Sequence, residues 1–297
     1  MNTLRNVGRD EPLTTEQGLY IKQQAVFAAR RAFQGRKLFG ASIRKIDSGS
    51  QTFGYDTRSR TAAAAIDLGW PGRLTMDAVN LTRSTVAIPN MHKEFEINKL
   101  DLASSRMSGE PLNTSNVEES AYQVAYLEDV VLINGKALDG TVYDFKGLYQ
   151  TGKASGNYDT TGYVWSTVAN IPTCVKASFA LLLEDNIQPP WNLTINQTQW
   201  MQAFEFIGTT SKTYQDFLRE ACQGGSVYVT PAITAGTLMW TAVNPQGMFE
   251  YVLAEDLTTE TETTSMKEGQ NLFGRNYIRG IPVVYDANAI CAVDDLT

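Results

Sequence analysis

The last third of the chain, residues 191–296, constrains the fold more than any other part of the sequence. It contains Asn192-Leu-Thr-Ile-Asn196 with Trp200 close behind, then Gly224-Gly225-Ser-Val-Tyr-Val-Thr-Pro231, and finally an acidic hairpin and a short apolar strand. The first segment predicts a strand that leads into a helix, and the Gly-Gly pair predicts the end of another helix before a new strand. Helices and strands are segregated rather than alternating, so the sequence predicts an α+β fold.

Composition excludes several classes of protein. With 297 residues, of which 43% are hydrophobic and 19% charged, the chain can bury a sizeable core and is not of the disordered class. The longest apolar run, Phe179 to Leu183, is too short to span a bilayer, and the N-terminus lacks the apolar segment of a secretion signal. We therefore expect a cytosolic chain without a membrane partner. The net charge of -7 disfavours a sequence-reading nucleic-acid protein but is compatible with a container for DNA.

Cysteine and histidine usage gives no sign of reactive or metal chemistry. Cys174, Cys222 and Cys291 are odd in number, far apart and set among apolar or helical neighbours, which predicts buried free thiols. His92 is the single histidine, and we expect it at the surface or at a strand end. No phosphate-binding loop or nucleophile elbow occurs. The sequence therefore predicts no catalytic residue, no cofactor and no metal site.

The N-terminal half predicts a helix, a long extended segment, a strand and a second long helix. The first helix begins at Leu13-Thr-Thr-Glu-Gln17, where Thr14 and Gln17 can form a capping box, and it ends at Gln34-Gly35. The strand covers residues 93–100. The second helix runs from the cap-rich segment near Asn113 to about Ile133.

Residues 40–85 lack helical periodicity, and we expect an extended two-stranded arm there, covered by neighbouring subunits. Its arginines either pair with acids of those subunits or keep a mobile arm soluble, and the sequence favours neither interpretation. The expected intersubunit contacts are Phe53, Tyr55, Arg58, Arg60, Trp70, Arg73 and Arg83.

Turn and capping residues predict the remaining helices and strands. Residues 135–169 are rich in loops, and Thr198 is expected to cap the helix that carries Trp200, Met201 and Phe204. The acidic stretch 255–262 lacks the spacing of a calcium loop and predicts a solvated loop or a contact between subunits. The further expected elements are helices at 175–183 and 214–221 and strands at 193–195, 227–230, 237–243, 249–253, 277–285 and 289–293.

Taken in order, these motifs resemble the encapsulin and tailed-phage capsid family. The resemblance begins with Leu13-Thr-x-Glu-Gln17 and Gly35-Arg36-Lys37, and continues with the strand and spine helix at 100–132, including Glu118 and Glu128-Asp129. Asn192 to Asn196 with Trp200, and Phe217 to Gly225 followed by Val229-Thr-Pro231, are similar to the outer domain of that family. Each motif is weak alone, whereas their order over nearly the whole chain is specific.

The resemblance implies an HK97-like capsid fold. Its parts are an N-terminal arm and helix (1–40), an E-loop (41–85), a P-domain with a long spine helix (86–150 and 254–297) and an A-domain (151–253). The acids of the spine helix, Glu118, Glu119, Glu128 and Asp129, are expected to be structural rather than catalytic. The residues 46–92 contain no lysine, which argues against a lysine-based cross-link from the loop.

The resemblance further implies a shell-forming protein rather than an enzyme. Expansions of the arm and of the loop at 136–168 favour a major capsid protein that self-assembles through hexamers and pentamers around the double-stranded DNA of a tailed virus. Portal, scaffold and decoration proteins are then further partners, and the protein is located in the virion after assembly in the host cytoplasm. The alternative is an encapsulin-type nanocompartment around a cargo enzyme. A remote alternative is an enzyme with a cleft between its two halves.

Overall fold

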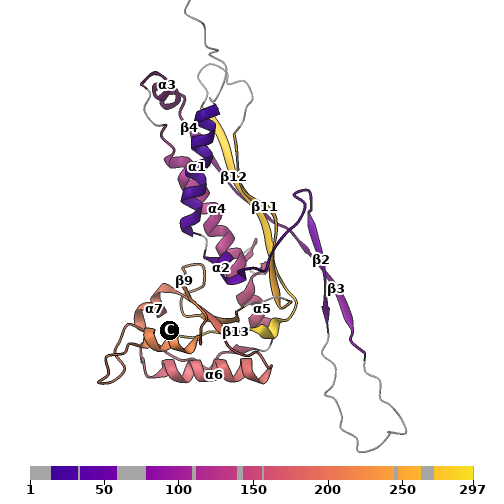
Figure 1. The fold of residues 1–297 in the computed structure, drawn as a ribbon, viewed down its shortest axis with the longest axis vertical. Helices are drawn as coiled ribbons and strands as arrows, with labels where there is room; N and C mark the ends of the chain where they lie inside the picture. The colour runs from indigo at the N-terminus through magenta and orange to yellow at the C-terminus, as the bar shows by residue number, and fades with distance from the viewer. Residues whose placement is uncertain are drawn as a thin grey trace, which may run out of the picture.

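Two sheets joined by a long helix make up the body of the computed structural model (Figure 1). The structure describes residues 15–32, 34–58, 78–108, 112–138, 143–155, 157–243, 247–261 and 271–296. The fold is HK97-like and mixes helices with strands, as the sequence predicts. Among the described residues no helix is both long and apolar enough to cross a membrane.

The first sheet has four strands in the order β1-β11-β12-β4. The central pair, β11 (Phe249–Thr261) and β12 (Leu272–Val284), is antiparallel, with register shifts that bend β11 near Leu253 and Glu255. β4 (Asn90–Ile97) pairs with the first half of β12, and the short β1 (Ile43–Lys45) runs parallel to β11. The inward residues of β4 alternate with exposed ones, so one face of this sheet is buried.

Two helices cover that buried face. α1 (Thr15–Ala32) packs Ile21 and two alanines against the start of α4 (Ser115–Ile133), because small side chains let the two helix backbones approach closely. The start of α4 belongs to the core shared with α1, whereas its end belongs to the larger core under the second sheet. α4 therefore connects both cores, which is the role expected of a spine helix.

The second sheet has five strands in the order β7-β13-β10-β8-β9. Every residue of its three central strands, β8 (Trp191–Ile195), β10 (Leu238–Ala242) and β13 (Ile290–Val293), is buried. The outer strands are β7 (Tyr158–Asp159) and β9 (Val227–Val229). α6 (Asn170–Glu184) inserts Phe179 between two tryptophans, with ring centroids 4.3 Å from Trp191 and 4.9 Å from Trp240.

Short elements complete the body and an arm leaves it. They are α2 (Gly35–Phe39), α3 (Lys99–Ser108), α5 (Leu148–Ser155), α7 (Gln197–Gln202), α8 (Tyr214–Ala221), the hairpin β5 (Gly135–Ala137) with β6 (Tyr143–Lys146), and a 3-10 turn at Ala287–Ala289. The arm is the antiparallel pair β2 (Thr52–Arg58) and β3 (Leu81–Ala87), which extends away from the body (Figure 1). The expected two-stranded arm is confirmed over these residues.

Several expected elements differ in the structure. α6 begins at Asn170 rather than near 175, and α3 and α5 replace what the sequence indicated as strand end and loop. The acidic stretch after Leu253 is not a solvated loop, because it continues β11 as far as Thr261. The side chain of Asn196, not that of Thr198, caps α7, and this helix ends before Phe204.

The sheets also divide the chain differently from the expected domain boundaries. β13, grouped above with 254–297, pairs with β10 and β7 in the five-stranded sheet, and β11 enters the four-stranded sheet already at Phe249. The expected capping box at Thr14 lies outside the described residues.

Candidate assembly surfaces

The turn that follows α1 is held on the spine helix by one buried carboxylate. Asp129, which is 2% exposed, accepts the backbone N–H groups of Gln34 and Gly35, each at 2.9 Å. A Cβ atom at position 35 would lie 3.0 Å from Asp129 Oδ1 and 3.2 Å from Leu132 Cδ1, so a larger residue there would press on both side chains. The carboxylate therefore fixes where the chain turns from α1 into α2.

A second buried acid ties the same turn to the four-stranded sheet. Arg36 Nε lies 2.8 Å from Glu128 Oε1, and Arg36 Nη1 lies 2.9 Å from Asp256 Oδ1. The hydroxyl of Tyr251 on β11 donates to the same oxygen of Glu128. One guanidinium thus joins α2, α4 and β11, and breaking such a buried pair by removing one partner is costly.

Burial sets the protonation of both acids. It raises the pKa of the Asp129 carboxyl to about 7, although the two backbone N–H groups and Arg36 oppose that shift. Burial also raises the pKa of Glu128, against the attraction of Arg36 and the hydrogen bond from Tyr251. Both side chains contact backbone or neighbouring side chains inside the body, so their positions support a structural role.

The root of the arm packs on its own chain. Phe53 and Tyr55 contact a small core that includes Val252, Ile281 and Val283 of the four-stranded sheet. The Tyr55 ring meets that of Tyr285 edge-on at 5.8 Å, and the guanidinium of Arg44 lies 5.3 Å above the Phe53 ring.

Arg279 of β12 fixes the same root through the backbone, donating to the carbonyl oxygens of Ser48 and Ser50. The arm therefore leaves the body from a fixed base.

The predicted contact residues divide into two groups. Phe53 and Tyr55 come together at the arm root, half-buried within the subunit, whereas Arg83 is 80% exposed and lies 3.9 Å from Asp56 on the opposite strand. The side chain of Arg58 and the whole of Arg60, Trp70 and Arg73 lie outside the described residues. His92 is exposed on β4, as expected.

Sequence reasoning did not find Arg279, because it stands in no recognisable motif, and it named Asp256 within the acidic stretch 255–262 without its contact to Arg36. It singled out Arg36, Glu128 and Asp129 through their place in the motifs of the resemblance, without their pairing.

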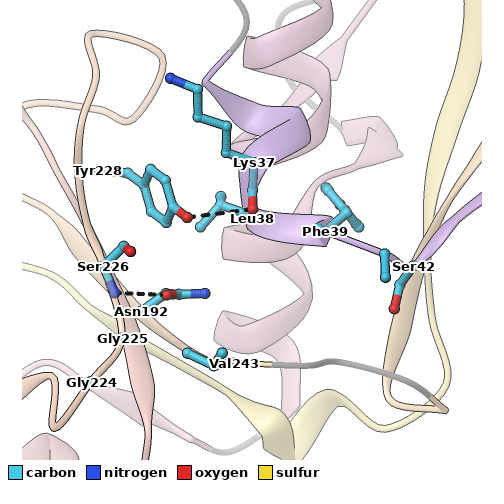
Figure 2. A pocket seen from close by; sticks show the side chains of 12 residues that line it. Lys37, Leu38, Phe39, Ser42, Asn192, Gly224, Gly225, Ser226, Tyr228 and Val243 are labelled. Atoms are coloured by element: carbon cyan, nitrogen blue, oxygen red, sulfur yellow. Dashed lines mark hydrogen bonds between the residues drawn. The ribbon is translucent and has the colours of Figure 1, made fainter.

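A small cavity of about 140 Å³ lies where the α2 turn meets the five-stranded sheet (Figure 2). The Tyr228 hydroxyl donates to the Lys37 carbonyl oxygen at 3.4 Å across this junction. Asn192 on β8 accepts the Ser226 N–H at 3.0 Å, which holds the Gly224-Gly225 turn against the sheet. The cavity marks a joint between the two halves and carries no convergent set of charged groups.

Exposed apolar side chains gather at three places. α1 exposes Leu19 and Phe27, and α3 exposes Leu100 and Met107. The third place is the end of α7 and the segment after it, which expose Met201, Phe204 and Phe206. Large exposed apolar side chains in clusters mark contacts with other molecules.

Metal and thiol chemistry have little support in the described part of the chain. There, no group of three or more His, Cys, Asp or Glu side chains converges to hold a metal ion. The three cysteines are free and buried, as predicted. Burial raises the pKa of Cys174 and Cys291 to about 12 and that of Cys222 to about 11. Thiols of this kind are poor nucleophiles.

Three features define the class of shell proteins with the HK97-like fold: a four-stranded sheet covered by two helices, a projecting arm and a second sheet. The chain belongs to the family described as "Encapsulating protein for peroxidase", whose model matches residues 1–270. This is a family of structural shell proteins, so the resemblance inferred from the sequence is confirmed.

Solved structures of shells agree with this fold. The chain is similar to a virus-like particle from Pyrococcus furiosus, with a TM-score of 0.67, 14% identity, and coverage of 94% of this chain and 99% of that one. It is also similar to the capsid of Myoviridae phage XM1, with a TM-score of 0.59, 10% identity and coverage of 86% and 91%. A structure of Mycobacterium phage Bobi is similar as well, with a TM-score of 0.62, 11% identity and coverage of 86% and 88%. At these identities the likeness concerns the fold alone.

Proposed function

We propose that this chain is the subunit of a closed shell that encloses a protein cargo. The observation that carries this proposal is the match of the family model to residues 1–270, because that match compares amino-acid sequences and not the fold alone. The likeness to phage capsids lies at 10–12% identity and supports a common fold rather than a common content. Copies of the chain assemble through many weak, identical contacts, and closure of the shell makes their sum stable.

The second candidate is the major capsid protein of a tailed virus, which the expanded arm and the expanded segment 136–168 favour. The interior would then hold double-stranded DNA without reading its sequence, and portal, scaffold or decoration proteins would be partners. The net charge of -7 suits that function, since an interior that does not bind the DNA backbone tightly lets the genome be packed. The protein would be located in the virion rather than in the cytoplasm.

The contents of particles from the native source separate the two candidates. Tailless shells that contain a second protein and no nuclease-protected nucleic acid support the compartment. Tailed particles filled with DNA overturn it in favour of the viral head. A chain that stays a small, discrete oligomer contradicts both candidates and favours the remote alternative, an enzyme with a cleft between its two halves.

In either shell we assign the arm to contacts between neighbours. Phe53 and Tyr55 set its base, and the outer residues Arg58, Arg60, Trp70, Arg73 and Arg83 are proposed to reach the adjacent copy. Deleting residues 50–83 should leave a folded chain that assembles poorly. Normal shells from the deletion variant, with an unchanged concentration threshold for assembly, would contradict this assignment.

A further inference from the structure

The small cavity between α2 and the five-stranded sheet has walls made largely of backbone and of neutral polar groups (Figure 2). Gly40 and Ala41 line it from the turn after α2, and Gly224 and Gly225 line it from the turn before β9. A single buried water needs only about 10–15 Å³ by the same measure. The cavity of about 140 Å³ therefore has room for a ligand of several non-hydrogen atoms.

Asn192 on β8 directs an unused pair of hydrogen-bond donors into this cavity. It is 5% exposed, and its Oδ1 atom accepts the Ser226 N–H at 3.0 Å. Because a backbone N–H can only donate, this bond holds Oδ1 towards the turn before β9 and Nδ2 away from it (Figure 2). The two N–H groups of Nδ2 have no acceptor in the described part of the chain. A buried donor without an acceptor is costly, so the cavity is prepared for a group that accepts hydrogen bonds.

Two hydroxyl groups from other segments face the same cavity. Ser42, in the turn after α2, has a buried hydroxyl oxygen that finds no hydrogen-bond partner among the described residues. Ser226 adds a hydroxyl on the opposite wall, where the residue is exposed at the rim. Three segments far apart in the sequence thus bring unused hydrogen-bonding groups to one small space.

The charges around the cavity favour a ligand that is negatively charged. Among the twelve described residues that line it, none is acidic, although acidic residues outnumber basic ones by 32 to 25 in the whole chain. Lys37 is the single charged residue of this lining, and its exposed ammonium group lies 3.0 Å from Gln34 Oε1. Amide, hydroxyl and ammonium groups all donate to carboxylate and phosphate oxygens, and hydrogen bonds to such charged acceptors are the stronger ones.

We propose that this cavity binds a small free oxyanion of the size of phosphate or acetate, and we call Lys37, Ser42, Asn192 and Ser226 the joint site. Asn192 Nδ2 and the two hydroxyls donate to the oxygens of the anion, while Lys37 supplies positive charge at the mouth. The inference does not depend on what the shell encloses.

An anion in the joint site would contact both halves of the subunit. Ser42 lies between α2 and β1, whose neighbour in the four-stranded sheet is β11, whereas Asn192 lies in the five-stranded sheet. Across this junction the printed contact is weak, since the Tyr228 hydroxyl lies 3.4 Å from the Lys37 carbonyl oxygen. A bound anion therefore stabilises the position of one half against the other.

The test compares the full-length wild type with N192D and with the matched control N113D. Aspartate at position 192 keeps an oxygen that accepts the Ser226 N–H, and it replaces the donors in the cavity by a second, negatively charged oxygen. Asn113 is exposed before the start of α4 and its Oδ1 also accepts a backbone N–H, that of Ser115, so N113D makes the same change of charge at a distant surface.

Isothermal titration calorimetry with inorganic phosphate, and separately with acetate, measures binding in slightly alkaline buffer at constant ionic strength. Circular dichroism reports folding. We expect saturable binding of one phosphate per wild-type chain, the same Kd for N113D, and a Kd at least about tenfold higher for N192D. Saturation by phosphate alone identifies a phosphate-like ligand, whereas saturation by acetate alone identifies a carboxylate.

The opposite results are equally distinct. If neither anion gives saturable binding to the wild type, the proposal is wrong. If N192D binds as tightly as the wild type, the anion occupies another place and the joint site is excluded. Should N192D fail to fold, K37Q/S42A takes its place with the same tenfold criterion, because it removes one hydroxyl and the positive charge while Asn192 keeps its bond to Ser226.

Discussion

The buried carboxyl of Asp129 makes the stability of the subunit depend on pH in an unusual direction. Its pKa is about 7 in the folded chain and 3.8 as a model group, so the folded chain binds this proton more tightly than the unfolded chain does. The resulting stabilisation is complete below pH 3.8 and is lost as the pH rises towards 7. Most paired carboxylates behave in the opposite way, because their charged form is the one that folding favours.

The expected magnitude follows from the two pKa values. Each pH unit between them changes the free energy of unfolding by about 1.36 kcal/mol. The slope falls to half of that value at the folded-state pKa, so the free energy of unfolding changes by roughly 2 kcal/mol from pH 5 to pH 7 and only slightly more from pH 7 to pH 8. D129N cannot ionise, and its amide oxygen can still accept the Gly35 N–H.

The assay is urea unfolding of the unassembled chain, followed by the fluorescence of its five tryptophans, at pH 5, 6, 7 and 8. The free energy of unfolding of wild type minus that of D129N should fall by roughly 2–3 kcal/mol between pH 5 and pH 8. Glu128 is present in both chains, so its own titration cancels to first order. Parallel curves for the two chains would refute the reasoning and place the Asp129 pKa near its ordinary value.

Two further predictions concern the arm and the turn before β9. R279A removes both hydrogen-bond donors to the loop that precedes β2, so limited proteolysis near the arm root should become faster. The control R275A removes an exposed ion pair with Glu260 and should leave the rate of proteolysis unchanged. Equal rates for both variants would exclude this anchor. G225A places a Cβ 1.8 Å from the Trp191 carbonyl oxygen and should lower the melting temperature severely. G18A meets no atom within 4 Å inside α1 and should stabilise the folded chain by about 0.5–1 kcal/mol. Comparable melting temperatures for the two glycine variants would contradict the close approach at position 225.

Sequence reasoning succeeded where local chemistry decides the structure. α8 begins at Tyr214 as expected, because Thr213 and Asp216 form a capping box in front of it. It ends at Ala221, shortly before Gly224, whose positive φ does not continue a helix. α4 likewise ends at Ile133, next to Asn134 and a Gly135 in the left-handed region.

Two of the helices that the sequence did not predict, α3 and α5, have physical explanations. α5 contains Gly152, a weak helix former, which is needed there because a Cβ would lie 2.7 Å from Ile290 Cγ2 on β13. α3 is mostly exposed, with Leu100 at 75% and Met107 at 90%, so it shows no apolar periodicity to recognise.

The candidate surfaces could be predicted only in part, because they depend on contacts between distant segments. The acidic end of β11 is polar enough to suggest a loop, yet pairing with β12 makes it a strand. The link from Arg279 to the carbonyls before β2 joins residues that no local pattern connects. Family motifs pointed to Arg36 and Glu128, whereas their ion pair emerges only when α2 lies against α4.

The position of β12 between β11 and β4 has a consequence for synthesis of the chain. β4 ends at Ile97 and its partner begins at Leu272, and β1 must likewise wait for β11. Contacts so far apart in sequence form late and slowly, because a long loop has to close before they form. A growing chain on the ribosome therefore carries an unpaired β4, and no complete four-stranded sheet, until β12 has emerged. Since the arm root packs on β11 and β12, the arm gains its fixed base only after both strands have formed, and assembly is postponed until then.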